Sequence, residues 1–339
     1  MSTGENANRL CGLFKSLGNP PFFLYRICHY LNKFVPQGLA SYIYKRNKKE
    51  YECEGVADFL LETYDGSGQA VHPDIAYYGN QYWLTATPYP YGMEEYENPC
   101  IYHGDDLNNL KVPQGPIAVQ HKHTQGIHLS DPCFAINNEI LYCYYRESER
   151  KGGIEEQTVW GIQYSEANKI WGDPVLLLDS ADDKILSPAM LFNEIGELVV
   201  YYVSSLKGKF SLVSTRAEGV VSQLTEHSII DAPEEYDLWH IGITKVKDIY
   251  NDKTDSIELL GLFLFKSKLA GGGMKLFETR NNGLEPVWNI VKEVDMPQSI
   301  KGIMKFPYKS CYIPKQNGNI LLSFRDKKSR NRMIILNKQ

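Results

Sequence analysis

One two-strand phrase recurs along this chain and constrains its fold more than any other feature. Each copy has a Pro or His near its start, then an aliphatic strand, a short turn with Gly or Asn, and an aromatic or β-branched strand. The copies start at residues 72, 130, 187, 239 and 308, so they lie 52–69 residues apart. They read HPDIAYYGNQYWLTAT, SDPCFAINNEILYCYYRE, SPAMLFNEIGELVVYYVSS, WHIGITKVKDIYNDKTDSIELLGLFLFK and YKSCYIPKQNGNILLSFRD.

The spacing of the phrase predicts an all-β fold, a five-bladed β-propeller spanning residues 51–339. A repeat of this length holds about four short strands and their turns, which is one propeller blade. A β-sandwich would also give many short strands, but it would not repeat one phrase at such even spacing. The Gly-rich stretch KLAGGGMKL lacks a phosphate-binding spacing and is interpreted as a hairpin loop.

Residues 1–50 form a basic, aromatic arm before the propeller, for which two short helices are expected at about 22–34 and 37–45. Between Asn6 and Lys49 there are eight basic residues and no acidic one, whereas the chain from Glu50 onward holds 28 basic and 40 acidic residues. Residues 6–49 could therefore lie on an anionic membrane surface or pack on the acidic body. Nucleic acid is not an expected partner, because no DNA- or RNA-binding motif accompanies the patch.

Two features of the chain favour a cytoplasmic location, where the protein could also bind peripherally to the inner leaflet. The start lacks a signal-peptide pattern, and no run approaches the roughly 20 apolar residues that cross a bilayer. Seven cysteines without a CxxC pair indicate free thiols, most of them buried.

Residues at matching positions of the phrase should converge on the central channel of a propeller. These are Asp74, Asp131, Ser187, His240 and Tyr308. Four aromatic residues, Trp83, Tyr89 and Tyr91 after Asp74 and Trp239 before His240, are candidates for stacking on sugar rings. We therefore expect a substrate site for an oligosaccharide or polysaccharide.

The order HPDI, ENP, SDP, SPA, WHI and YKS resembles bacterial proteins of glycoside hydrolase family 43 over about residues 55–330. The resemblance implies a five-bladed propeller that cleaves pentose-type or related glycosidic linkages. It also implies that Asp74 is the catalytic base and that Asp131 tunes the pKa values of its neighbours. In the family, a glutamate on the third blade is the acid.

The catalytic glutamate of the family has no counterpart on the third blade, because this chain reads Ile185-Leu186-Ser187-Pro188 where that glutamate would stand. Glu97 is the first candidate for a replacement acid, and Glu234, Glu235 and Asp237 are weaker ones. The alternative for Glu97 is a loop residue that caps backbone amides, and Asp74 and Asp131 could likewise cap turns.

No cofactor and no protein metal site are predicted. In the resembled family, a histidine on one blade can hold water or a calcium ion in the central channel, and the resemblance implies this structural role for His240. The alternative for His240 is a buried imidazole that is hydrogen-bonded to a backbone carbonyl. His72, His121, His123 and His128 are expected in loops, and HKHTQGIH matches no metal-ligand spacing.

Three functions remain open on the sequence alone. The first is a glycosidase with an unconventional acid, and the second is a glycan-binding propeller without turnover. The third is a membrane-associated transferase or accessory factor in the assembly of capsular or surface polysaccharide.

Overall fold

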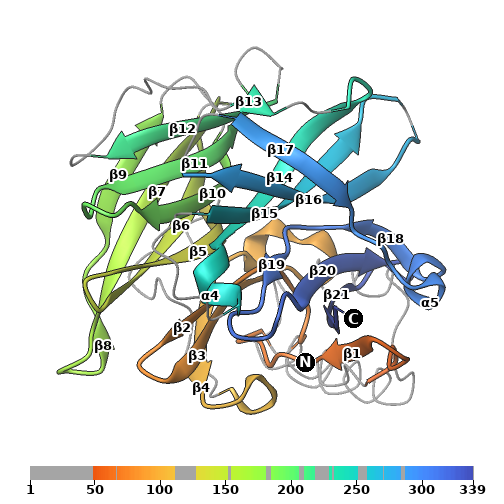
Figure 1. Ribbon diagram of the computed structural model, residues 1–339, viewed down its shortest axis with the longest axis horizontal. Helices are drawn as coiled ribbons and strands as arrows, with labels where there is room; N and C mark the ends of the chain where they lie inside the picture. Colours follow the sequence, from red (N-terminus) through yellow and green to blue (C-terminus); the bar gives the residue numbers. More distant parts are fainter. Residues whose placement is uncertain are drawn as a thin grey trace, which may run out of the picture.

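The chain forms five β-sheets that follow one another along the sequence (Figure 1). The computed structural model describes residues 49–338 apart from 66, 111–126, 152–153, 181–184, 206–209, 218–228, 231–232, 251–257, 270 and 284–286. The arm predicted for residues 1–50, with its helices and its membrane contact, lies almost entirely outside the described residues. Among the described residues, no helix has both the length and the apolar character needed to cross a bilayer.

The five sheets are the blades of a closed propeller. The innermost strands of the blades contact one another in a ring, in which the innermost strand of the fifth blade meets that of the first. This confirms the predicted fold. Blade 1 contains β2 (Ala70–Tyr78), β3 (Gln81–Pro88) and β4 (Cys100–Gly104); blade 2 contains β5 (Ile127–Asn137), β6 (Ile140–Lys151), β7 (Ile154–Ser165), β8 (Ile170–Trp171) and β9 (Val175–Ser180); blade 3 contains β10 (Ile185–Phe192), β11 (Leu198–Ser204) and β12 (Ser211–Ala217); blade 4 contains β13 (Ile229–Ile230), β14 (Tyr236–Lys245), β15 (Glu258–Ser267), β16 (Met274–Asn282) and β17 (Val287–Glu293); blade 5 contains β18 (Met304–Pro307), β19 (Cys311–Tyr312), β20 (Ile320–Asp326), β21 (Asn331–Leu336) and β1 (Val56–Phe59).

Helices are few and short in the described part of the chain. They connect strands or extend their ends: α4 (Val246–Tyr250), α5 (Gln298–Lys301) and the 3-10 turns η1 (Pro90–Gly92), η2 (Glu94–Tyr96) and η3 (Leu107–Asn109).

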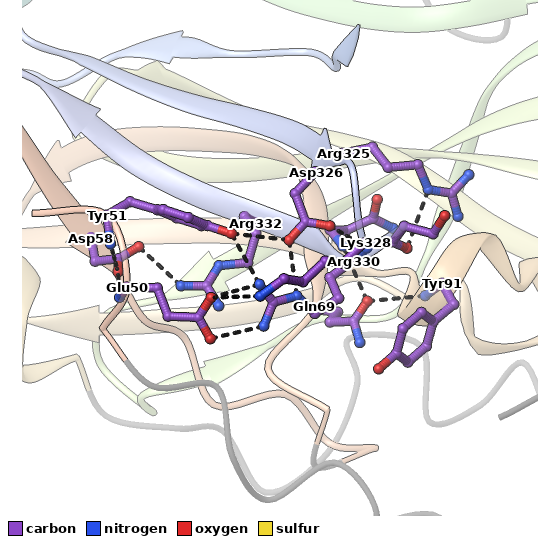
Figure 2. A network of polar contacts seen from close by, with 12 residues as sticks. Glu50, Tyr51, Asp58, Gln69, Tyr91, Arg325, Asp326, Lys328, Arg330 and Arg332 are labelled. Carbon is purple, nitrogen blue, oxygen red and sulfur yellow. Dashed lines mark hydrogen bonds and ion pairs between the residues drawn. The ribbon is translucent and has the colours of Figure 1, made fainter. Parts of the chain in front are cut away.

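The ring is closed by the early strand β1, which completes the last blade. It pairs antiparallel with β21, Val56 opposite Leu336, and Figure 1 shows β1 in orange beside β21 in dark blue. An ionic clasp reinforces this junction (Figure 2): Arg330 donates to both carboxylate oxygens of Glu50, at 3.0 and 2.7 Å, and to Asp326 at 2.9 Å. The hydrogen bond from Arg330 lowers the pKa of Glu50 to about 2. The two ends of the described chain are thereby joined by charged groups as well as by a strand ladder.

The apolar core is divided among the interfaces between neighbouring blades. Five buried clusters occupy the five junctions, because a blade in the ring buries both of its faces and its strands are apolar on both sides. Cys100, Cys133, Cys143 and Cys311 are buried free thiols within or beside these clusters, as predicted, whereas Cys53 is exposed.

Candidate functional site

A residue followed by proline interrupts the inner strand of each of the first three blades. The pairs are His72-Pro73, Asp131-Pro132 and Ser187-Pro188, and their first residues have left-handed φ angles of 53°, 51° and 49°. The strand ladder is irregular at each pair. Left-handed backbone costs energy for residues other than glycine and is concentrated at functional sites, where bulges re-aim side chains.

The ladder register corrects one assumption of the sequence comparison. After the bulges it resumes at Asp74 opposite Thr85, at Cys133 opposite Tyr144 and at Ala189 opposite Tyr201. Asp74 is therefore equivalent to Cys133, and the position of Asp131 is matched by His72. The two aspartates do not occupy one repeated position, as the phrase alignment had assumed.

Three side chains from three blades meet at the bulges, and we call them the axial cluster: His72, Asp131 and His240. Nδ1 of His72 lies 3.2 Å from Oδ1 of Asp131, and Nδ1 of His240 lies 3.7 Å from the same oxygen. The two imidazole rings are 4.8 Å apart between centroids. All three residues are buried, and Asp131 is 0% exposed. His72 and His240 lie on strands β2 and β14, so the loop position expected for His72 is wrong.

Two cations lie beside the axial cluster. The guanidinium of Arg146 on β6 is 3.0 Å from Oδ2 of Asp131 and donates to Oγ of Ser130 at 2.7 Å. The ammonium of Lys309 donates to the carbonyl oxygens of Pro132 and Pro188, at 3.0 and 3.3 Å. Lys309 therefore holds the bulges of two blades from a third.

Burial and the neighbouring charges determine the protonation states of Asp131, His72 and His240. Burial by itself would raise the pKa of Asp131, but the neighbouring His72, Arg146 and His240 lower it below its usual range. Burial lowers the pKa of His72 to about 4 and holds that of His240 well below its ordinary value. At neutral pH the axial cluster therefore combines one carboxylate with two neutral imidazoles.

Glu97 is a buried acid that interacts electrostatically with Asp131 of the axial cluster. It follows η2, its backbone oxygen accepts from the amide of Leu129, and its Oε2 lies 3.6 Å from Nε2 of His128. Burial raises the pKa of Glu97 well above the usual range, Arg146 opposes the shift, and Asp131 adds to it. A buried carboxyl group with a raised pKa therefore lies within electrostatic reach of Asp131 and Arg146.

Asp74 faces a different space. It lines a cavity of about 350 Å³ together with later residues of the inner strands, such as Tyr77, Ile136 and Phe192. Its Oδ2 accepts from the backbone amide of Phe134 at 2.6 Å. Burial raises the pKa of Asp74 to about 6, while Lys309 and the amides of Phe134 and Ile75 oppose the shift. Asp131 is not among the causes of this shift, whereas it does add to the rise in the pKa of Glu97.

Two aromatic residues expected in the substrate site, Tyr308 and Trp239, border the axial cluster, and Tyr89 packs against Tyr308. The ring of Tyr308 lies 5.8 Å from His72 and 6.3 Å from Tyr89, and the ring of Trp239 lies 6.0 Å from His240. Tyr89 and Trp239 are half-buried, which leaves part of each ring accessible. Burial raises the pKa of Tyr308 to about 12, so its hydroxyl stays a hydrogen-bond donor at neutral pH.

Three other predicted binding residues are structural. Trp83 is 4% exposed and stacks on His103 in the core between blades 1 and 2. Tyr91 is buried beside the clasp, where its amide donates to Gln69 (Figure 2). Ser187 is 0% exposed, and its hydroxyl both donates to and accepts from the backbone of Ile241. Their side chains are buried in the protein and are not available to a substrate.

The weaker acid candidates also lie apart from the axial cluster. Glu234 and Glu235 are exposed, and Asp237 lies 3.8 Å from the ammonium of Lys268. His121 and His123 fall outside the described residues, whereas His128 lies on β5 rather than in a loop.

Sequence reasoning missed four residues of this region: His72, His128, Arg146 and Lys309. For His72 a signal was available, because an alignment of the blades on the X-Pro pair places it at the position of Asp131. Arg146 lies on β6, the second strand of its blade, whereas the sequence comparison used only the inner strands. The ladder of β5 and β6 places Arg146 opposite Ser130 and so next to Asp131.

The axial cluster also has the composition and spacing of a metal site: among the described residues, its two histidines and one aspartate are the side chains of these types found close enough together to share an ion. One donor atom from each residue lies within 4.8 Å of the others.

Solved structures share this fold at low sequence identity. One is an N-acetylgalactosamine deacetylase from F. plautii in complex with blood group B trisaccharide, with a TM-score of 0.56 and 16% identity over 83% of this chain and 84% of that chain. Another is the native arabinanase Arb43A of Bacillus subtilis, with a TM-score of 0.51 and 15% identity over 79% and 93%. A third is a family 43 endo-arabinanase of Bacillus licheniformis, with a TM-score of 0.51 and 14% identity over the same shares. No family model and no curated protein matches the chain.

Proposed function

We propose that this propeller, which has the fold of family 43 glycoside hydrolases, is a hydrolase of carbohydrates. The observation that carries the proposal is Glu97, a buried carboxyl group whose pKa is raised and which interacts with Arg146 and Asp131. The three solved structures of the same fold are described as two arabinanases and a deacetylase, all acting on carbohydrates.

The residues around Asp131 and Glu97 suit a hydrolytic step. A buried carboxyl group with a raised pKa, such as Glu97, is suited to give its proton to a leaving oxygen or nitrogen, which is the role of the missing third-blade glutamate. Partly exposed rings of Tyr89 and Trp239 offer faces on which a sugar ring can stack. The base role predicted for Asp74 has weaker support, because Asp74 lines the cavity among the later residues of the inner strands.

A substrate panel with one matched pair of variants tests the proposal. Arabinan, xylo-oligosaccharides and N-acetylated oligosaccharides are incubated with the protein, and new reducing ends and free acetate are measured. We expect turnover of at least one member, and we expect Glu97→Gln to lower kcat by about 10²- to 10⁴-fold. Glu94→Gln is the control, because Glu94 belongs to the adjacent turn η2 but is exposed.

Two results would reject the proposal. Undiminished turnover in Glu97→Gln would remove Glu97 from the chemistry. Glycan binding by calorimetry without turnover of any panel member would favour a non-catalytic glycan-binding propeller. The alternative role in polysaccharide assembly stays a prediction from residues 6–49.

A further inference from the structure

The axial cluster has a property that the proposed acid catalysis does not use. Nδ1 of His72, Nδ1 of His240 and Oδ1 of Asp131 are buried and make no hydrogen bond, whereas Oδ2 of Asp131 is paired with Arg146. The contacts of 3.2 and 3.7 Å between the imidazoles and Asp131 lack hydrogen-bond geometry. A buried polar atom without a hydrogen bond costs about 1–3 kcal/mol, so several such atoms facing one another need a common partner.

The fold aims these atoms at one point from three independent elements. His72 and Asp131 are turned out of their ladders by left-handed bulges, and His240 follows the bulge of β14. The donor atoms lie within 4.8 Å of one another. Coordination at about 2.0–2.2 Å places two ligand atoms at most about 4.4 Å apart, so small side-chain shifts would bring all three onto one ion. A partner that accepts lone pairs from three sides is a cation.

The donor set also selects the kind of cation. Two imidazole nitrogens and one carboxylate oxygen suit zinc, iron, cobalt, nickel or manganese, whereas calcium takes six to eight oxygen ligands. Three protein ligands leave coordination positions open for water or a substrate oxygen, as in catalytic rather than structural sites. His72 and His240 keep 5% and 6% exposure, so the cluster is not sealed from solvent.

The charged neighbours act in two ways. Arg146 lies against Oδ2 of Asp131, so it fixes the carboxylate and leaves Oδ1 to face the imidazoles. Arg146 and Lys309 also repel a cation, but the ammonium of Lys309 is directed at the carbonyl oxygens of Pro132 and Pro188. We therefore expect affinity in the micromolar range rather than the tighter binding of closed structural sites.

We propose that His72, Asp131 and His240 bind one divalent transition-metal ion. Binding follows from the cluster alone, whereas the catalytic use of the ion rests on the proposed function. In that use a water bound to the ion releases one proton to solvent and adds to the reacting carbon. The bond to the leaving group breaks with its electron pair, the leaving atom takes the proton of Glu97, and Glu97 then regains a proton from solvent. The ion would thus supply the activated water that the sequence assigned to Asp74.

The test measures metal binding directly. Tag-free full-length protein is stripped with a chelator, reloaded separately with Zn²⁺, Co²⁺, Mn²⁺ and Ca²⁺, desalted and analysed by elemental mass spectrometry. We expect one equivalent of Zn²⁺ or Co²⁺, a visible Co²⁺ absorption spectrum, and at least a tenfold weaker affinity in both His72→Asn and His240→Gln. Asparagine is chosen at position 72 because it tolerates left-handed backbone.

Two control variants locate the ion. His103→Gln changes a histidine that stacks on Trp83, and the double variant His121→Gln/His123→Gln changes the HKH phrase; both should bind like the wild type. Less than about 0.2 equivalent in the wild type, binding of Ca²⁺ alone, or undiminished binding in both cluster variants would overturn the proposal. Full turnover by the stripped protein would overturn the catalytic use and leave hydrolysis standing. Stoichiometric metal without turnover would leave the site standing and reject the proposed function.

Discussion

The guanidinium of Arg146 lies 3.0 Å from the carboxylate of Asp131, and their side chains are 9% and 0% exposed. Removing one partner of a buried ion pair leaves the other charge uncompensated, at a cost of about 3–5 kcal/mol. We therefore predict that Arg146→Met lowers the free energy of unfolding by that amount in urea denaturation. Arg150→Met is the control, because Arg150 lies 3.7 Å from Glu94 with both side chains exposed, where a pair contributes about 0–1 kcal/mol. Equal losses in the two variants would contradict the prediction.

Asp74 should make stability depend on pH. Its pKa is about 6 in the folded protein against 3.8 as the reference value, so the folded state holds the proton more tightly than the unfolded state. Its contribution is complete below about pH 4 and is lost as the pH rises through 6, with a difference on the order of 3 kcal/mol. Asp74→Asn, which cannot ionise, should gain that amount relative to the wild type between pH 4 and pH 8.

The measurement is chemical denaturation at four pH values. Asp295→Asn is the matched control, because the side chain of Asp295 is 96% exposed, and its difference from the wild type should stay nearly constant with pH. A constant difference for Asp74→Asn as well would show that Asp74 titrates normally.

Ser187 should prove to be a structural residue. Its hydroxyl donates to the carbonyl of Ile241 at 2.9 Å and accepts from the amide of Ile241 at 3.0 Å, which ties blade 3 to blade 4. Ser187→Ala leaves both buried groups unsatisfied, and we predict a loss of about 1–3 kcal/mol in the free energy of unfolding. The KM for any substrate found should be unchanged, and Ser299→Ala, at an exposed serine, should change neither quantity. A raised KM in Ser187→Ala would restore Ser187 to the substrate site.

The clasp of Figure 2 should protect the ring junction. Arg330→Met removes the partner of Asp326, whose side chain is 1% exposed, and the bidentate contact with Glu50. We predict faster hydrogen exchange in the amides of Val56–Phe59 and no change in blade 2. Lys328→Met is the control, because Lys328 approaches Glu50 only at 3.9 Å and is exposed. Equal exchange in β1 of the two variants would show that the strand ladder alone holds the junction.

The fold followed from the sequence because a propeller repeats its blade. The spacing of the phrase predicted five units, and each predicted inner-strand segment overlaps one of β2, β5, β10, β14 and β19. Periodicity is a local signal, and every blade carries it independently.

The site was predicted less completely, for a physical reason. Asp131, Glu97, His240, Tyr308 and Trp239 were named from the sequence and lie in one region, but Asp74 was aligned with Asp131. A bulge shifts the register by the residues it contains, so the same strand can direct His72 to the axial cluster and Asp74 to a cavity. Such a shift depends on backbone conformation, and the order of carboxylates along the chain does not reveal it.

The junction between β1 and β21 also has a consequence for synthesis of the protein. Val56–Phe59 are synthesised before every other described strand, but their pairing partners at residues 333–336 are made last among these strands. Until then the edge of β1 has no partner, and the first and fifth blades cannot share their core. Long-range pairings of this kind form slowly. We therefore expect the nascent chain to be an open arc of blades that closes into a ring only after translation of β21.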